Sequence, residues 1–369
     1  MNPDKTTHDL LRRLGGQGYM SSLAYDTAWI ARLAEIDPAL SNRALDWICA
    51  HQLSDGSWGT ERPFYYHDRA ISTLAAMIAL SRGRRARDRS QIMHGRLALE
   101  RITEGATGGL QNDPNGATVG FEMLVPPLAA EAESLGLIAN QGTRILGRMA
   151  GARQKKLALL EGRRINRHIT AAFSTELAGI DGMHRLDLDN LKEPDGSIGH
   201  SPSASAYYLL RANPNDQECL AYLHRIGNQD GGVPDLIPFE IFETAWVIWN
   251  LSLARDWPAE INEEFAPHLQ YLQTCWKPGH GVGLSATYSI PDGDDTAIVF
   301  ELLSRAGREV DIQAVLSFEE ADHFRTYHLE VDTSSSVNIH VLGALRQAGL
   351  PVDTPEVQKA LGHLRKRKL

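Results

Sequence analysis

Helical periodicity is the feature that most constrains the fold of this chain. Apolar residues recur at three- and four-residue steps in several Ala- and Leu-rich segments. That spacing places them along one face of an α-helix. The clearest such segments are residues 70–80, 204–210, 242–253 and 296–303. Alternating strand patterns are scarce, so the sequence predicts an all-α protein.

Turns rich in Gly, Pro, Asp and Asn separate these segments. Helices of about 10–15 residues joined by such turns indicate stacked helical hairpins, as in an α/α barrel. Residues 52–59, 193–199 and 228–234 share an acidic-Gly turn and form a weak internal repeat. Glycine permits the tight turn, and Asp can bond its own backbone there. We interpret the repeat as architecture, with Gln52 capping a helix end and Trp58 lying over it.

Length and composition narrow the class of protein. At roughly 100–200 residues per domain, 369 residues predict two domains. No segment approaches the ~20 apolar residues of a membrane span, and the start lacks a signal-peptide core, so we expect a cytoplasmic protein. The net charge of −9 disfavours nucleic-acid binding. The three cysteines lie far apart, which indicates small buried hydrophobes rather than a zinc or disulfide framework.

The motif at residues 292–297 carries the most chemistry. It reads Asp-Gly-Asp-Asp-Thr-Ala and stands at the start of an apolar helix. One Asp would cap that helix, but Asp292, Asp294 and Asp295 exceed what a cap needs. Crowding and burial raise the pKa of a carboxyl, and a protonated carboxyl can act as an acid. Taken alone, the motif would also suit a glycosidase or a metal site.

Sequence context favours one family. Residues 292–297 match the Asp-x-Asp-Asp-Thr-Ala signature of class II diterpene cyclases, and residues 22–29, Ser-Leu-Ala-Tyr-Asp-Thr-Ala-Trp, resemble a segment near the start of these enzymes. The turn at 55–59 resembles their Gln-Trp repeat. Three shorter segments recur in the same order: 120–122, 201–206 and 231–234. The chain is therefore similar to class II diterpene cyclases along nearly its whole length, most of all to bacterial two-domain members such as tuberculosinyl (halimadienyl) and copalyl diphosphate synthases.

The resemblance implies a fold of two α/α barrel domains, called β and γ, with γ inserted in β. We expect a first β segment at 1–35, γ at 36–255 and a second β segment at 256–369. Related chains add more β-domain helices after the position of Leu369, so this β domain is expected to be incomplete. We therefore expect an open groove beside Asp294 and low activity, unless another chain or a larger oligomer supplies the wall.

The resemblance also implies a mechanism. Asp294 would be the general acid that protonates the terminal alkene of geranylgeranyl diphosphate, and Asp292 and Asp295 would tune it. Asn338 is expected to orient the acidic proton; the less favoured alternative is a helix cap or a turn residue. The product would be a bicyclic diphosphate of halimadienyl or copalyl type. Aromatic rings could stabilise the cations through their faces; the candidates are Trp246, Trp249, Tyr288, Phe300, Phe324 and Tyr327.

For the diphosphate, the resemblance implies basic residues and Mg²⁺. Family members carry an acidic stretch before residues 120–122, and here it leaves Glu122 and Asp113 as metal ligands. A basic helical run could bind the phosphates or be a solvated face; its residues are Lys155, Lys156, Arg163, Arg164 and Arg167. We select Lys155, Lys156, Arg164 and Arg167 as diphosphate ligands.

Other classes of protein stay open at this stage. Farnesyl diphosphate could be the substrate and give a drimenyl-type product, or the chain could be an inactive helical scaffold. A class I terpene synthase is disfavoured because Asp294-Asp295 is followed by Thr296-Ala297-Ile298 and not by its metal-binding pattern. A protein prenyltransferase subunit would need zinc ligands around Cys275, and no convincing set surrounds it.

Overall fold

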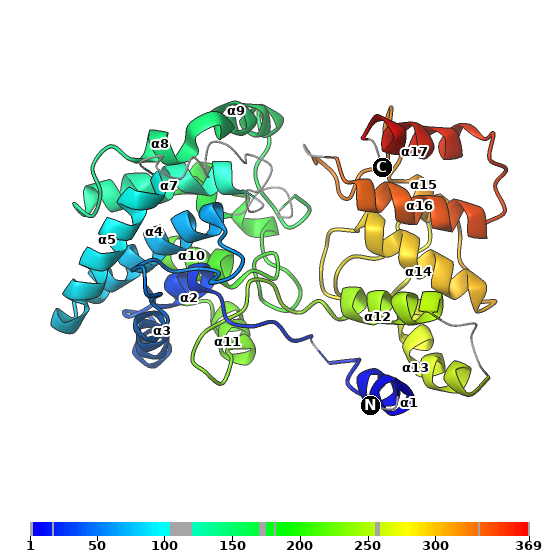
Figure 1. Ribbon diagram of the computed structural model, residues 1–369, viewed down its shortest axis with the longest axis horizontal. Coiled ribbons are helices and arrows are strands. Elements are labelled where there is room, and N and C mark those ends of the chain that lie inside the picture. Colours follow the sequence, from blue (N-terminus) through cyan, green and yellow to red (C-terminus); the bar gives the residue numbers. More distant parts are fainter. Residues whose placement is uncertain are drawn as a thin grey trace. The chain divides into compact units, whose positions relative to one another are not determined.

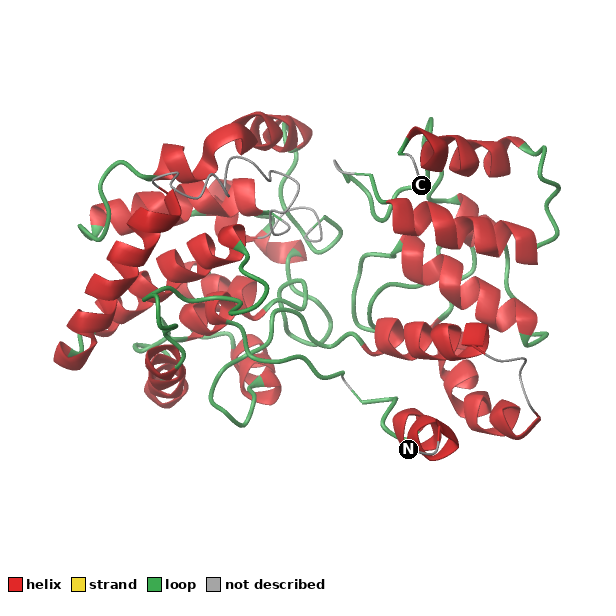
Figure 2. Cartoon of the chain, in the orientation of Figure 1, coloured by secondary structure: helices red, strands yellow, loops and turns green. Residues whose placement is uncertain are grey.

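The computed structural model describes residues 3–16, 18–103, 120–169, 175–180, 182–254, 259–330 and 333–367, and helices are the main secondary structure of these ranges. Within those ranges there are four isolated β-bridges but no strand (Figures 1 and 2). The α-helices are α1 (Pro3–Leu11), α2 (Ala24–Ile30), α3 (Pro38–Ala50), α4 (Tyr66–Gly83), α5 (Arg89–Thr103), α7 (Phe121–Ser134), α8 (Gly142–Leu146), α9 (Ala150–Leu159), α10 (Pro202–Arg211), α11 (Gln217–Ile226), α12 (Glu240–Ala254), α13 (Ala259–Cys275), α14 (Gly293–Arg305), α15 (Gln313–Leu316), α16 (Ser335–Gln347) and α17 (Pro355–Lys366). The 3₁₀ helices are η1 (Ala86–Asp88), η3 (Gly147–Met149), η4 (Thr175–Ala178), η5 (Met183–Arg185) and η6 (Leu188–Asn190).

The predicted helical segments are all confirmed. Residues 70–80, 204–210, 242–253 and 296–303 lie within α4, α10, α12 and α14. Side-chain caps fix where several helices begin, because an oxygen at the N-cap satisfies a backbone N–H that the helix leaves free. Four caps of this kind belong to α3, α10, α11 and α16: Asp37, Ser201, Asp216 and Ser334.

The three acidic-Gly turns adopt one common geometry. A backbone N–H donates to the carbonyl four residues further on in each turn, over 2.9, 2.8 and 2.9 Å; the donors are Leu53, Glu193 and Asn228. The Asp midway between donor and acceptor accepts from the N–H of the acceptor residue at 3.0 Å in every copy. The glycine between them has φ of 88°, 90° and 92°, a left-handed conformation that favours glycine. The repeat is therefore a structural one, as the sequence predicted.

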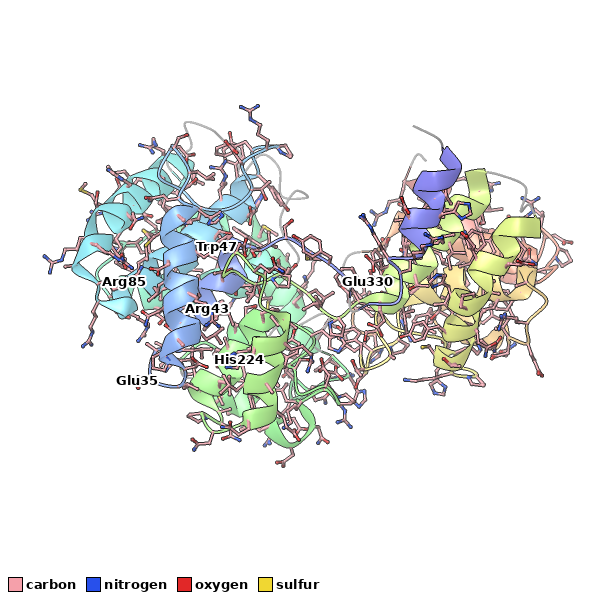
Figure 3. The ribbon with its side chains drawn as sticks, turned by 90° about the horizontal axis from the view of Figure 1, so that it is seen from below. Glu35, Arg43, Trp47, Arg85, His224 and Glu330 are labelled. Carbon is pink, nitrogen blue, oxygen red and sulfur yellow. The ribbon has the colours of Figure 1, made fainter. Side chains whose placement is uncertain are left out.

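Aromatic side chains tie two of these turns to α3. Trp58 is fully buried, and its indole N–H donates to the Ile48 carbonyl at the end of α3 over 2.7 Å. Gln52 instead links its turn to α5, through the Gln91 carbonyl at 2.9 Å. Trp47, labelled in Figure 3, donates to Asp230 of the third turn over 2.9 Å. Trp58 thus satisfies one carbonyl near the end of α3, and Gln52 bonds a carbonyl in the first turn of α5.

The chain forms two compact units, and one is inserted within the sequence of the other. The first comprises Met1–Tyr19 and Pro238–Leu369, and the second comprises Met20–Ile237. An insertion was expected, but the inserted unit spans residues 20–237, whereas the sequence predicted an insert at 36–255. The difference arises because α2 packs on α4 and α10, whereas α12 packs on α14. Such long-range packing cannot be read from local composition.

In the first unit, α14 lies at the centre. It packs against α12, α13, α15 and α16, and α17 covers α16 (Figure 1). Its segment 297–303 is buried throughout. This buried helix begins at the carboxylate motif, so the packing of the core fixes the position of the motif. In the second unit, α4 is buried along most of its length and contacts α2, α5 and α7.

Candidate active site

The carboxylate motif is built around the first turn of α14. Asp292 caps the helix, and its Oδ1 accepts from the backbone N–H groups of Asp294 at 2.8 Å and Asp295 at 3.0 Å. Gly293 donates its N–H to the Thr326 carbonyl at 2.7 Å. A Cβ atom at Gly293 would collide with the Arg325 carbonyl oxygen, so only glycine fits here. The Asp-Gly-Asp-Asp pattern thus suits a helix start crossed closely by a loop.

The three carboxyl groups have different surroundings. Asp292 is engaged as the cap. The Asp295 side chain is buried, with Oδ1 accepting from the Trp246 indole at 2.9 Å and Oδ2 lacking a hydrogen-bond partner. The Asp294 side chain is 16% exposed. Of the three, Asp294 therefore has the carboxyl that a substrate could reach without displacing the helix cap.

Both oxygens of Asp294 contact α16. The Ser336 hydroxyl donates to Oδ2 over 2.9 Å, and Nδ1 of His340 lies close to Oδ1. Ser336 and His340 are four residues apart, so they lie on the same face of the helix. One helix therefore holds the carboxyl group of Asp294 from both sides.

Burial and mutual repulsion govern the electrostatics of the motif. Burial raises the pKa of Asp295 well above its ordinary value, and the negative charges of Asp292 and Asp294 add to the effect. Burial also raises the pKa of Asp292, against the lowering effect of its two backbone hydrogen bonds. The raised pKa values let Asp292 and Asp295 keep their protons to higher pH than an ordinary Asp. These two groups can therefore be carboxylic acids rather than carboxylates.

Two tryptophans of α12 enclose His340. The imidazole is 5.0 Å from the Trp246 ring at 90° and 4.8 Å from the Trp249 ring at 80°, measured between centroids. Each indole N–H is bonded to a carboxylate of α14: Trp246 to Asp295, and Trp249 to Glu301 at 3.1 Å. These bonds fix the indoles, and the indoles fix the orientation of His340 beside Asp294.

The hydrogen bonds of Asn338 join its amide to the backbone and not to the acid. Its Nδ2 donates to the carbonyls of Phe324 at 3.0 Å and Ser334 at 2.8 Å, and its Oδ1 accepts from the Phe324 N–H at 3.0 Å. The amide is thus engaged with backbone and holds the loop at Phe324 against α16. His340, two residues further on, contacts the acid instead. The signal for it was the polar pair Ser336 and His340 at four-residue spacing on an apolar helix.

The six candidate aromatic residues differ in their surroundings. Trp246 and Trp249 lie at the acid, as described. Phe300 and Phe324 are 3% and 0% exposed and belong to the hydrophobic core of the first unit. Tyr288 is buried as well, whereas Tyr327 is partly exposed.

The proposed diphosphate and metal residues lie in the second unit. Lys156 and Glu122 form an ion pair of 2.5 Å with side chains only 11% and 4% exposed. Lys155 and Arg164 are exposed, and Arg167 is partly exposed. The expected single basic helix is wrong: α9 ends at Leu159, and Gly162, with φ of 72°, lies in the turn that follows. The arginines therefore lie beyond the helix, and Asp113 lies outside the described residues.

The described residues do not build a metal centre. No group of three or more His, Cys, Asp or Glu side chains with metal-binding geometry occurs among them. Glu122 is also already paired with Lys156. Mg²⁺ usually takes one or two carboxylates together with substrate phosphates. Glu122 could at most provide one such ligand, after rearrangement of its ion pair.

Comparison with known proteins identifies the relatives of the chain. It is 48% identical over 369 residues to the type B diterpene cyclase of Mycobacterium tuberculosis, covering 99% of this chain and 74% of the relative. It is 32% identical over 320 residues to the chloroplastic ent-copalyl diphosphate synthase 1 of Oryza sativa subsp. japonica, covering 83% and 35% of the two chains. No protein-family model matches the chain.

A solved structure of a related enzyme has a similar fold. The chain is similar to ent-copalyl diphosphate synthase from Arabidopsis thaliana in complex with (S)-15-aza-14,15-dihydrogeranylgeranyl thiolodiphosphate, with a TM-score of 0.73 and 28% identity over 99% of this chain and 52% of that one. The fold, the carboxylate motif and these relatives define a helical terpene cyclase. The chain belongs to the class II diterpene cyclase family. Among the described residues, no helix has the length and apolar character required to cross a membrane.

Proposed function

We propose that this protein cyclises geranylgeranyl diphosphate to a bicyclic diphosphate of halimadienyl or copalyl type, with Asp294 as the general acid. The observation that carries the proposal is the partial exposure of Asp294, whose two oxygens are held by Ser336 and His340. Asp292 is committed to the helix cap, and Asp295 is buried beneath Trp246.

The reaction is an isomerisation in which a proton enters and a proton leaves. Asp294 gives its proton to the terminal alkene, a C–H bond forms, and the carboxylate stays on the enzyme. The tertiary cation is attacked by the next alkene and then by another, which closes two rings. A base finally removes a proton and leaves an alkene. The carbon–oxygen bond to the diphosphate is not broken.

The surroundings of Asp294 suit an acid strong enough for an alkene. Hydrogen bonds from Ser336 and His340 stabilise the carboxylate that remains after proton transfer. The Trp246 and Trp249 rings beside His340 supply aromatic surface without a nucleophile, which suits a site where cations form. Asp292 and Asp295 keep the helix start and the indole in position.

The choice of substrate rests on the relatives. Their names include a diterpene cyclase and copalyl diphosphate synthases, and the ligand of the Arabidopsis structure is a geranylgeranyl analogue. The chain spans 74% of the mycobacterial relative but 35% of the rice one. Farnesyl diphosphate with a drimenyl-type product is the second candidate. We place the protein in the cytoplasm, acting on a free isoprenoid diphosphate, and leave an oligomer as a possibility to be measured.

We further propose that the diphosphate binds near Lys155, Lys156, Arg164 and Arg167, accompanied by Mg²⁺ near Glu122. The support is the pair of lysines on α9, the two arginines in the segment that follows it, and Glu122 in contact with Lys156. No step of the reaction is assigned to the metal. A combined Lys155→Gln and Arg164→Gln variant should raise KM with little change in kcat, and unchanged KM would remove these two residues from the site.

One product analysis tests the proposed function. The protein is incubated with geranylgeranyl or farnesyl diphosphate in D₂O, and the products are dephosphorylated and analysed by mass spectrometry. We expect a bicyclic diterpene alcohol carrying one deuterium on the ring methylene next to the gem-dimethyl carbon, because the Asp294 proton exchanges with solvent and adds to the CH carbon of the terminal alkene. Release of inorganic diphosphate would contradict the class of reaction. Faster turnover of farnesyl than of geranylgeranyl diphosphate would contradict the choice of substrate.

A further inference from the structure

We propose that the second unit binds a small monovalent anion, of the size and charge of chloride, in a buried pocket beside Trp29 and Arg32. Trp29 belongs to α2, and Arg32 lies two residues beyond the end of that helix. Both residues lie within the second unit, whereas the carboxylate motif belongs to the first. Binding of such an anion can be tested without turnover of any substrate.

The pocket lies among α2, α7, α10 and η4. Its charged lining residues are Arg32, Glu131, Glu176 and Arg211, and aliphatic side chains such as Leu128 also line it. The space open to a water-sized guest is about 10 Å³, which is close to the room that one water molecule needs. The pocket therefore suits a single atom-sized guest and is far too small for an isoprenoid chain.

Two buried side chains of the lining carry hydrogen-bond donors that are not used. The indole Nε1 of Trp29 and both Nε and Nη1 of Arg32 lack a hydrogen-bond partner among the residues that the structure describes. The two residues are only 4% and 8% exposed. They lie together, since Cζ of Arg32 is 3.9 Å from the centroid of the Trp29 ring. A buried donor without a partner costs free energy, and an acceptor in the pocket would remove that cost.

The charges around the pocket favour an anion over a water molecule. Nη2 of Arg32 donates to both oxygens of Glu131, at 2.6 and 2.7 Å, but Arg82 also binds Glu131, at 2.6 Å. Two guanidinium groups thus share one buried carboxylate. Arg211 and Glu176 add one charge of each sign at the lining. Three guanidinium groups against two carboxylates leave one positive charge, and buried charge is unfavourable unless it is paired.

The protonation of the neighbouring groups supports this charge balance. Burial lowers the pKa of Arg32 to about 10; Glu131 opposes that fall, and the other guanidinium groups add to it. Arg32 therefore still carries its charge at neutral pH. Asp26 and Asp235 interact electrostatically with Glu176, and burial raises the pKa of both acids, which favours their neutral forms. A halide in the pocket would accept from Trp29 and Arg32 and neutralise the excess positive charge.

Thermal denaturation in matched salts tests the site. The full chain is melted in about 0.2 M sodium chloride and in sodium gluconate of the same ionic strength, whose anion is too large for the pocket. We expect Tm to be higher in chloride by about 2 °C or more. Trp29→Phe keeps the ring on which Arg32 lies but removes the N–H, and should lose most of that difference. Arg43→Gln, which removes an exposed cation of the same unit, should keep it. Equal Tm values of the original protein in the two salts, or an undiminished chloride effect in Trp29→Phe, would overturn the proposal.

Bromide can locate the ion directly, because it has the charge of chloride and scatters X-rays anomalously. Crystals of the full chain grown in sodium bromide are measured at the bromine absorption edge. We expect an anomalous peak in contact with Nε1 of Trp29 and the guanidinium group of Arg32. A water molecule there without anomalous signal, or bromide bound only at other places, would overturn the proposal. Neither measurement depends on whether the protein forms a cyclised diphosphate, so failure of the proposed function would leave the anion site standing.

Discussion

The imidazole of His340 lies against the carboxyl group of Asp294, with Nδ1 directed at Oδ1. This contact joins α16 to the start of α14 and is enclosed by the rings of Trp246 and Trp249. Neutral imidazole can donate from Nδ1 or accept there, depending on its tautomer. The donor tautomer leaves Asp294 free to give its proton to a substrate, and we therefore assign it to the active enzyme.

Replacing the imidazole should impair chemistry more than binding. His340→Phe retains an aromatic ring between the two indoles but removes the group that contacts Asp294. We expect kcat to fall about 100-fold with little change in KM, as for loss of a group that acts on the acid in the transition state. Steady-state kinetics with geranylgeranyl diphosphate measure the effect. His280→Phe, at an exposed histidine of the same unit, is the control and should behave as the original enzyme. A His340→Phe enzyme with normal kcat would remove His340 from the site.

Asn338 should matter for stability. Asn338→Ala removes three hydrogen bonds to the backbone of Phe324 and Ser334 in a buried position. Unsatisfied buried backbone groups should lower the free energy of unfolding by about 3 kcal/mol. Thermal and urea denaturation measure this loss, and activity per folded molecule should change little at low temperature. Normal stability combined with lost activity would restore the catalytic role first predicted for Asn338.

Asp295 should make stability depend on pH. Its pKa is raised in the folded protein by burial. The folded state therefore binds more protons than the unfolded one, in which an Asp titrates at about 4. The contribution of Asp295 to stability is fully present below that pH and is lost as pH rises toward the folded value. Asp295→Asn keeps a neutral acceptor for Trp246 and should raise Tm relative to the original protein at pH 7 but much less at pH 4.

Differential scanning fluorimetry between pH 4 and pH 8 checks this sign. The control is Asp353→Asn, which changes an exposed carboxylate in the loop before α17. The difference in Tm between this variant and the original protein should be the same at all pH values. A gain in Tm for Asp295→Asn that is larger at pH 4 than at pH 7 would show that the folded protein holds Asp295 as a carboxylate.

Sequence reasoning succeeded where local physics decides the structure. Apolar spacing located α4, α10, α12 and α14, and the glycine that follows an Asp in the repeat marked turns with left-handed φ. The excess of carboxylates over a helix cap singled out residues 292–295.

Sequence reasoning failed where helix packing decides. Asn338 and His340 are two residues apart and face different sides of α16, so the choice between them depends on how α16 lies against α14. The sequence predicts one basic helix over residues 155–167, but α9 ends at Leu159 and a left-handed turn follows at Gly162. The divisions between the two units depend on contacts of α2 and α12 that span long stretches of sequence.

The most direct test of the account is the Asp294→Asn variant incubated with geranylgeranyl diphosphate. The amide has nearly the shape of the acid but no acidic proton. We predict that bicyclic product falls at least about 1,000-fold while the circular-dichroism spectrum is unchanged, and that Asp353→Asn forms product at the normal rate. Formation of the same product by folded Asp294→Asn at a normal rate would contradict the assignment of Asp294 as the acid.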